Sequence, residues 1–366
     1  MKGDFLIMAI NLASKYAKEL AQAFTQKSVV DGVACKDYEF TGVKNLKVYT
    51  AVSQPLNDYQ RTGTNRYGTP TEAQDTVQDM VVEKDRSFSI TVDKGNNSEQ
   101  MGAKEASKIL AIEMNEQAIP EMDRYALRKF LDYAGTVKEA EAEPTEDTIV
   151  KMISDGMVEM GNKKVPAEGR YIFNGWSWFG MLRLSKQFIG VEALAKEALV
   201  KGAVGTFMGA QVVTVPDDYL MKGNNKAYFL IVYKNSVLQP KKVQDYFVKE
   251  NPAGINGALI EGRFIYDAFV IGAKCDGVYA VVENGSVQAM PEFSLTGSDL
   301  TVTSAGANKI RVTLDGTDPR FSDSAVETTS GGKVALSSGK VSAKAVAFDD
   351  ELFTSAVAAD EERTIA

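Results

Sequence analysis

Carboxylates are the residues of this chain best suited to do chemistry, because the sequence contains no histidine. Histidine is the commonest general base and metal ligand, and every Ser-His or Cys-His nucleophile pair needs it. Paired carboxylates can replace it in acid–base catalysis. Two sets have suitable spacing, namely Asp217 with Asp218, and Glu113 with Glu116 and Glu121. Neither set accompanies a substrate-binding pattern, so we expect no catalytic residue.

Two further patterns resemble ligand sites only in part. Gly202, Gly205 and Gly209 lack the spacing of a dinucleotide fingerprint or a P-loop, and no Lys-Ser/Thr pair follows them. Asp315 and Asp318 offer oxygen ligands for calcium, but the terminal Glu and the additional carboxylates of an EF-hand are missing. We interpret the DGTDP segment as a turn, and we expect no cofactor and no metal.

The two cysteines and the N-terminal segment indicate a reducing compartment. The apolar run at residues 5–10 is shorter than the core of a secretory signal, and no run approaches the ~18–20 residues that span a bilayer. We therefore expect a cytoplasmic protein in which Cys35 and Cys275 form no disulfide and are small buried residues. Met8 is a possible natural start.

A long hairpin is predicted near the N-terminus. Residues 46–53 and 80–93 alternate as strands do, with Phe88, Ile90 and Val92 on one face. More than twenty polar residues separate the two stretches, and loops of that length are usually functional or disordered. Arg and Tyr are enriched in interface hot spots. We therefore predict an intersubunit contact at the hairpin tip through Tyr59, Arg61, Arg66 and Tyr67.

A long helix is predicted after the hairpin. Apolar residues recur every fourth position from Ala106 to Met122, and the helix is expected to run from residue 97 to about 133. Pro120 lies inside it, so we expect a kink or break there. A shorter amphipathic helix is predicted for residues 9–25.

The rest of the chain mixes helices and strands without regular alternation, which indicates an α+β body. A short strand at 171–173 precedes a helix bearing Trp176, and strand-like runs cover 227–234 and 262–282. From residue 291 the chain lacks Tyr and Trp and shows short alternating runs at 300–305, 309–316 and 340–348. These runs are typical of a small β-sandwich.

Several blocks resemble the major capsid proteins of tailed phages and prophages of Gram-positive bacteria. They include MAINLASKYAKEL, KDYEFTGVKNLKVYTAVSQPLNDYQRTGTNRYGTP, KDRSFSITVDKGNNSEQMGAKEASKILAIEM and PAEGRYIFNG, and the resemblance covers roughly residues 8–290. That family is similar to the Hong Kong ninety-seven capsid fold, which encapsulins share.

The resemblance implies a division of the chain into successive parts. They are an N-terminal arm (1–40), an extended hairpin or E-loop (41–95), a peripheral domain with its spine helix (96–164), an axial domain (165–230), a return to the peripheral domain (231–290) and a C-terminal module (291–366). Some capsids of this fold cross-link Lys to Asn, but no motif supports that role for Lys84 or Lys94. No scaffolding segment precedes the arm in this sequence, which implies a separate scaffolding protein or assembly without one.

The C-terminal module resembles a different family. VTLDGTDPRFSDSA and SGKVSAKAVAFDDELFTSAV are similar to the immunoglobulin-like domain that follows the catalytic domains of some chitobiases and hexosaminidases. On a capsid subunit we expect such a module to project outward as a decoration.

The resemblance implies a non-enzymatic coat protein that assembles in the host cytoplasm and resides in the virion. Pentamers and hexamers of the chain would form an icosahedral shell, with a scaffolding protein and a portal as partners. The shell would enclose double-stranded DNA without sequence-specific binding, in agreement with a net charge of −8, and without a membrane. The alternatives are an encapsulin-type compartment and, from the C-terminal module alone, a carbohydrate-binding surface protein.

Overall fold

The computed structural model describes residues 28–38, 45–51, 56–70, 72, 75–95, 106–185, 206–296, 299–336 and 338–365. The predicted helix at 9–25, the start of the long helix and Gly202 and Gly205 lie outside these residues. The chain divides into two compact units. Unit 1 contains 83–123 and 241–267 besides the N-terminal segment, and unit 2 contains 29–82, 124–240 and 268–366.

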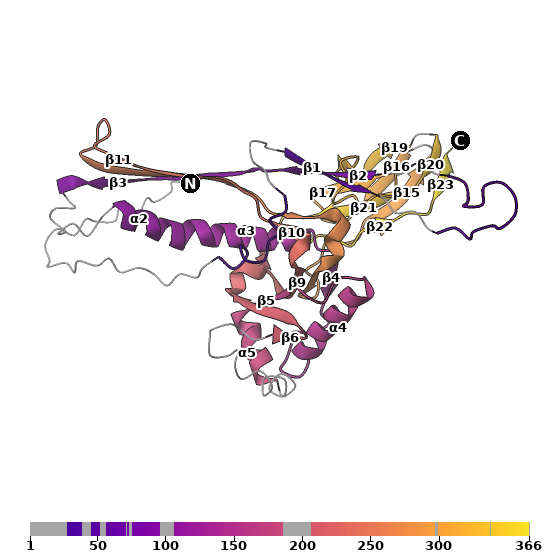
Figure 1. Cartoon of the computed structure of the whole chain (residues 1–366), viewed down its shortest axis with the longest axis horizontal. Helices are drawn as coiled ribbons and strands as arrows, with labels where there is room; N and C mark the ends of the chain where they lie inside the picture. The colour runs from indigo at the N-terminus through magenta and orange to yellow at the C-terminus, as the bar shows by residue number, and fades with distance from the viewer. Residues whose placement is uncertain are drawn as a thin grey trace. The chain divides into compact units, whose positions relative to one another are not determined.

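Unit 1 is built on a three-stranded antiparallel sheet of order β11-β12-β3 (Figure 1). Its strands are β3 (Lys84–Asp93), β11 (Lys241–Glu250) and β12 (Gly257–Tyr266). Phe88, Ile90 and Val92 are less exposed than their neighbours in β3, so the predicted alternation is confirmed. This face of the sheet packs against helical residues between 106 and 123, which belong to the same unit.

The long helix runs through Pro120 without the break that the sequence allowed, but its hydrogen bonding is irregular just before the proline. It consists of α2 (Ala106–Glu113), a π-helical turn η1 (Met114–Ala118) and α3 (Ile119–Asp132). The Ile119 N–H donates to the Met114 carbonyl, five residues back. This wider turn directly precedes Pro120, which has no N–H to donate, so the helix absorbs the proline by widening. The predicted end near residue 133 is confirmed.

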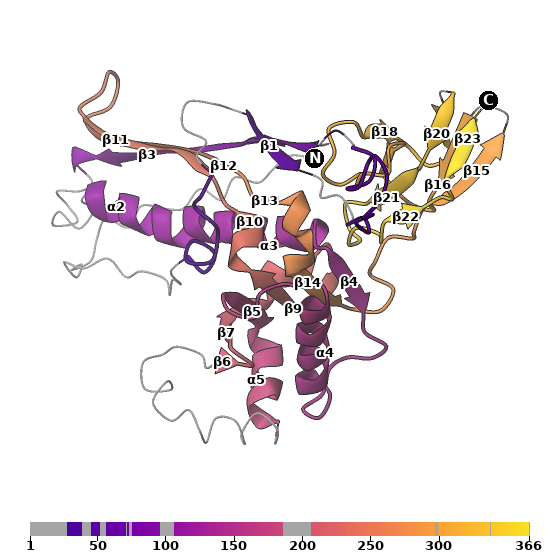
Figure 2. The same cartoon turned by 45° about the vertical axis from the view of Figure 1, so that its right-hand side comes forward.

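The centre of unit 2 is a mixed sheet of order β4-β14-β9-β5-β7-β6, with β8 beside β9. Its strands are β4 (Thr136–Glu139), β5 (Arg170–Gly175), β6 (Thr206–Phe207), β7 (Ala210–Val215), β8 (Met221–Lys222), β9 (Asn225–Tyr233) and β14 (Val278–Val282). β9 and β14 are buried almost throughout, because apolar clusters cover both faces. One cluster includes side chains of α4 (Ile149–Asn162) and α5 (Trp176–Leu184), which lie together in Figure 2.

Two predicted strand runs are interrupted in the structure. The run at 80–93 divides at Val82, since β2 (Asp75–Val81) pairs with β1 (Asn45–Ala51) whereas β3 joins the sheet of unit 1. The run at 262–282 contains the end of β12, β13 (Phe269–Val270), a 3-10 helix η5 (Gly272–Gly277) and β14. β13 pairs with β10 (Val237–Leu238). Short 3-10 turns also occur at η3 (Asp217–Leu220) and η4 (Lys234–Ser236).

The described residues from 291 to 365, which we call the C-terminal module, are all β. The strands are β15 (Glu292–Thr296), β16 (Asp299–Thr303), β17 (Lys309–Thr313), β18 (Val326–Thr328), β19 (Gly332–Ala335), β20 (Gly339–Val341), β21 (Lys344–Phe348), β22 (Ala358–Ala359) and β23 (Arg363–Ile365). The predicted run at 340–348 is thus two strands. Sheets β15-β16-β19 and β18-β17-β21-β22 share one apolar core, which contains Leu300, Val302, Ile310 and Val312.

The C-terminal module belongs to the same compact unit as the central sheet. Its Phe321 and Phe353 lie in one apolar cluster with Phe130, Leu127 and residues of β9 and β14. One side of the module is therefore occupied by the body. The domain boundaries and the role of the module as a decoration remain predictions. None of the helices within the described ranges is long and apolar enough to cross a membrane.

Candidate intersubunit contact surface

The predicted contact residues lie at the tip of the β1–β2 hairpin of unit 2. β1 and β2 pair antiparallel over seven residues, from Asn45 opposite Val81 to Ala51 opposite Asp75. The Asn45 amide donates a 2.9 Å hydrogen bond to Asp79 across the pair. Residues 56–70 follow within the connection, and we call them the hairpin tip.

The hairpin tip is held by its own short-range contacts. The Gln60 N–H donates to the Arg66 carbonyl at 3.0 Å, and the Gly68 N–H donates to the Asn65 carbonyl at 2.9 Å. The Arg66 Nε donates to the Gly63 carbonyl at 3.2 Å. Gly63, Asn65 and Gly68 have φ of 92°, 60° and 87°, in the left-handed region that Gly and Asn tolerate best. The tip is thus a folded turn with a defined shape.

Two tyrosines that contact each other are exposed on the hairpin tip. The Tyr59 and Tyr67 rings meet edge to face, with centroids 5.1 Å apart and planes inclined by 66°. Tyr59 is 53% exposed and Tyr67 is 84% exposed. Arg61 and Arg66 are also exposed. Together with Asp58 they give the tip a net charge of +1, whereas the whole chain has a net charge of −8. Such a surface suits an acidic or aromatic partner.

The structure brings three of the four predicted residues together. Tyr59 and Tyr67 touch, and Arg66 is tied into the same turn by its backbone and side chain. Arg61 lies in the same exposed segment, two residues after Tyr59. Contact with a neighbouring subunit remains a prediction for all four.

The exposure of three further apolar side chains was missed from the sequence. Trp176 and Leu184 of α5 and Met208 of the β6–β7 turn are 57%, 60% and 54% exposed. Trp176 meets Phe179 edge to face at 5.9 Å, whereas Trp178 is buried against Tyr228. The available signal was the Trp-Ser-Trp spacing, because residues two apart on a helix cannot both face the core.

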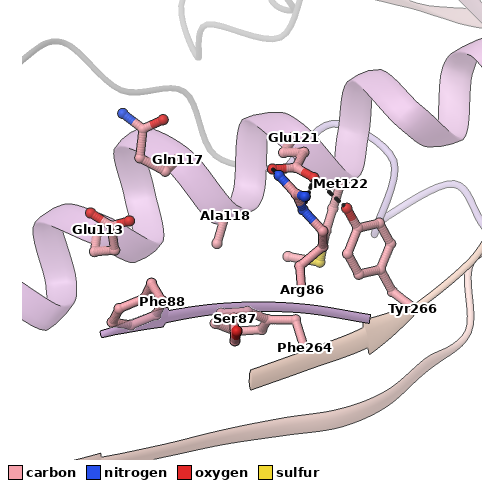
Figure 3. Close-up of a pocket in the computed structure, with 10 residues that line it drawn as sticks. All are labelled: Arg86, Ser87, Phe88, Glu113, Gln117, Ala118, Glu121, Met122, Phe264 and Tyr266. Atoms are coloured by element: carbon pink, nitrogen blue, oxygen red, sulfur yellow. Dashed lines mark hydrogen bonds and ion pairs between the residues drawn. The ribbon is translucent and has the colours of Figure 1, made fainter. Parts of the chain in front are cut away.

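Unit 1 contains a cavity of about 360 Å³ between the long helix and the sheet (Figure 3). Glu121 is the charged centre of its wall. Its carboxylate accepts the Arg86 Nε at 2.9 Å and the Tyr266 hydroxyl at 3.0 Å, as the dashed lines in Figure 3 mark. Burial and then the bond to Glu121 raise the pKa of Tyr266. Phe88 and Phe264 stack at 6.0 Å on the sheet side. Glu121 therefore ties the helix to the sheet within unit 1.

Four of the other carboxylates weighed for chemistry have structural partners, and Glu113 lines the cavity. Asp217 accepts the Ser177 N–H at 3.2 Å and its hydroxyl at 2.5 Å, which satisfies the N-terminus of α5. Asp218 lies 3.5 Å from Arg124. Asp315 accepts the Thr317 N–H at 3.0 Å, and Asp318 belongs to the same turn, so the turn interpretation of DGTDP is confirmed.

The cysteines are free thiols, but they are half-buried where full burial was expected. Burial raises the pKa of Cys275 to about 11 and also raises that of Cys35. Within the part of the chain that the structure describes, no group of three Cys, Asp or Glu side chains is placed to hold a metal ion.

Comparisons by sequence and by structure differ in outcome. No family model matches the chain, and no curated protein matches it. Among solved structures, a chain from Mycobacterium phage Che8 matches with a TM-score of 0.61 at 15% identity, covering 76% of this chain and 98% of that chain. A chain from the capsid structure of the cyanophage P-SCSP1u matches with a TM-score of 0.61 at 11% identity, covering 75% and 93%.

A third match comes from the head structure of the Helicobacter pylori bacteriophage KHP40. Its TM-score is 0.56 at 10% identity, with 78% of this chain and 98% of that chain covered. In all three cases nearly the whole of the phage chain is matched. The α+β chain therefore has the fold of proteins found in bacteriophage capsid and head structures.

Proposed function

We propose that this chain is a major capsid protein that self-assembles into the icosahedral head of a tailed bacteriophage. The observation that carries the proposal is the fold match, which covers 98% of the Che8 chain and 93% of the cyanophage capsid chain. The role is structural and non-enzymatic, and the assembled protein resides in the virion. The resemblance of residues 8–290 to capsid proteins of phages of Gram-positive bacteria supports the same function and suggests the host.

The hairpin tip is the proposed contact with a neighbouring subunit. It presents two exposed tyrosines and two arginines in a folded turn, and Tyr and Arg are frequent hot-spot residues. Such contacts join pentamers and hexamers into a closed shell. Each contact is repeated around the shell, so modest individual affinities add up to a stable lattice.

The proposed partners follow from the same function. The shell encloses double-stranded DNA, and the acidic balance of the chain suits containment with sequence-independent contact only. A separate scaffolding protein and a portal complete the head. The described residues from 291 to 365 form the proposed immunoglobulin-like module, whose free side is available as a decoration.

Expression of the full chain alone, followed by size-exclusion chromatography and negative-stain microscopy, tests the proposal. Closed particles, sheets or tubes tens of nanometres across support a shell-building subunit. A dispersed monomer, even with crowding agents and co-expressed scaffolding protein, would overturn it. Particles from native lysates that hold packaged enzyme in place of DNA would indicate an encapsulin-type compartment. Glycan binding by a chain that never assembles would favour the surface protein.

A further inference from the structure

The C-terminal module is packed into the body through two phenylalanines. Phe353 is fully buried, and its backbone makes two hydrogen bonds to the segment that precedes the module. The Phe353 N–H donates to the Ser286 carbonyl at 2.9 Å, and the Phe353 carbonyl accepts the Gln288 N–H at 2.8 Å. Phe321 is 8% exposed and lies 6.0 Å, centroid to centroid, from Tyr133 at the end of α3. These two phenylalanines of the module therefore pack in the core of the body, whereas the module also has an apolar core of its own.

A buried arginine fixes the loop that carries Phe321. The Arg320 guanidinium bonds to the Asp318 carboxylate, with an Nη2–Oδ2 distance of 2.7 Å, and a second nitrogen donates to the Ala134 carbonyl. Ala134 lies two residues after the end of α3. Arg320 thereby ties the loop of the module to the segment that follows α3 and orients the adjacent Phe321.

Phe321 presses against a glycine of the segment 270–272. A Cβ atom added to Gly272 would lie 2.7 Å from the Phe321 Cβ and 2.8 Å from its Cγ. Real Cβ contacts are not that short, so the phenylalanine occupies the space that a side chain at position 272 would take. The backbone of Gly272 is thus held in place from the side of the module.

The same segment also binds the β1–β2 hairpin. The Gly272 N–H donates to the Gln78 Oε1 at 2.8 Å, and the Gln78 Nε2 donates to the Val270 carbonyl at 2.8 Å. Both ends of the Gln78 amide are therefore engaged by one short backbone segment. Gln78 lies opposite Val48 in the hairpin register, so this clamp acts on both strands. A direct ion pair, Lys47 with Asp323 at 3.9 Å, is exposed and contributes little.

We propose that the C-terminal module braces the β1–β2 hairpin: Phe321 holds the backbone of Val270 to Gly272, which in turn clamps Gln78 of β2. Arg320 and Phe321 are positioning residues in this arrangement. The contacts from Phe321 through residues 270–272 to Gln78 all lie within one subunit. We infer from them that the module sets the direction in which the hairpin tip meets a neighbour, and this inference rests on the proposed function.

Hydrogen–deuterium exchange on the full chain tests the brace. Phe321→Ala removes the contact on the module side, and Gln78→Ala removes the clamp on the hairpin side. Both variants are expected to speed amide exchange in residues 75–81 by about tenfold or more. Phe293→Ala is the matched control, because it removes an aromatic ring that packs in the core of the module away from Gly272. It should leave exchange at 75–81 unchanged.

Two results would overturn the proposal that the module braces the hairpin. Unchanged exchange at 75–81 in Phe321→Ala overturns it, whether residues 309–313 of the module stay protected or unfold. Equal acceleration by Phe293→Ala with the module still folded would show general loosening and would also overturn it. The exchange is measured on the chain in whatever state it adopts, so a failure to form particles would remove the proposed function and leave this test intact.

Discussion

Removal of both tyrosines of the hairpin tip should weaken assembly without unfolding the subunit. A tyrosine presents about 150–250 Å², and Tyr59 and Tyr67 are 53% and 84% exposed. The two rings therefore offer about 280 Å² to a neighbour. If about half of that area becomes buried, at about 25 cal/mol per Å² the contact contributes about 3.5 kcal/mol. The double variant Tyr59→Ala, Tyr67→Ala should raise the critical assembly concentration by roughly a few hundredfold.

Light scattering against subunit concentration measures this effect, and circular dichroism checks that the variant is folded. Tyr49→Ala serves as the matched control, because Tyr49 is 66% exposed on β1 of the same hairpin but lies outside the tip. It should change the critical concentration much less than the double variant. An unchanged critical concentration in the double variant would refute the contact role of the tip.

Three further perturbations test the described structure. Phe353→Ala should lower the free energy of unfolding by about 3–5 kcal/mol in chemical denaturation, since the ring is fully buried; a loss below about 1 kcal/mol would contradict its packing. Gly135→Ala should lower the melting temperature, because its Cβ would lie 2.4 Å from the Cys275 carbonyl oxygen, and an unchanged midpoint would refute that close approach. Burial raises the pKa of Cys275 to about 11, so at pH 8 this residue should hold about a hundredfold less thiolate than an ordinary thiol. Its alkylation should be slow at pH 8 and should speed up as the pH rises toward 11. Fast alkylation at pH 8 would contradict the burial.

Local patterns predicted much of the secondary structure. The alternation in β3, the strand before α5, β9 and the end of the long helix follow from side-chain periodicity and chain length. The alternation could not reveal which strands pair. Val82 separates two strands that join different sheets, and strand partners far apart in the chain leave no local mark on the sequence.

The candidate contact surface was also predicted only in part. Tyr59 and Tyr67 were identified by residue type, but their ring contact depends on a turn with three left-handed residues. Trp176 was expected simply as part of a helix, because its exposure depends on which side of α5 the sheet covers. The burial of Phe353 could not be predicted from its neighbours in the polar run DDELFTSA, because the side chains that bury it come from the body.

Electron cryomicroscopy of particles assembled from the full chain tests the central claim most directly. The proposal predicts closed shells with rings of five and six subunits, in which the hairpin tip of each subunit touches a neighbour through Tyr59 or Tyr67. Particles without rotational symmetry, or a chain that remains a dispersed monomer under every assembly condition, would contradict the assignment as a capsid protein.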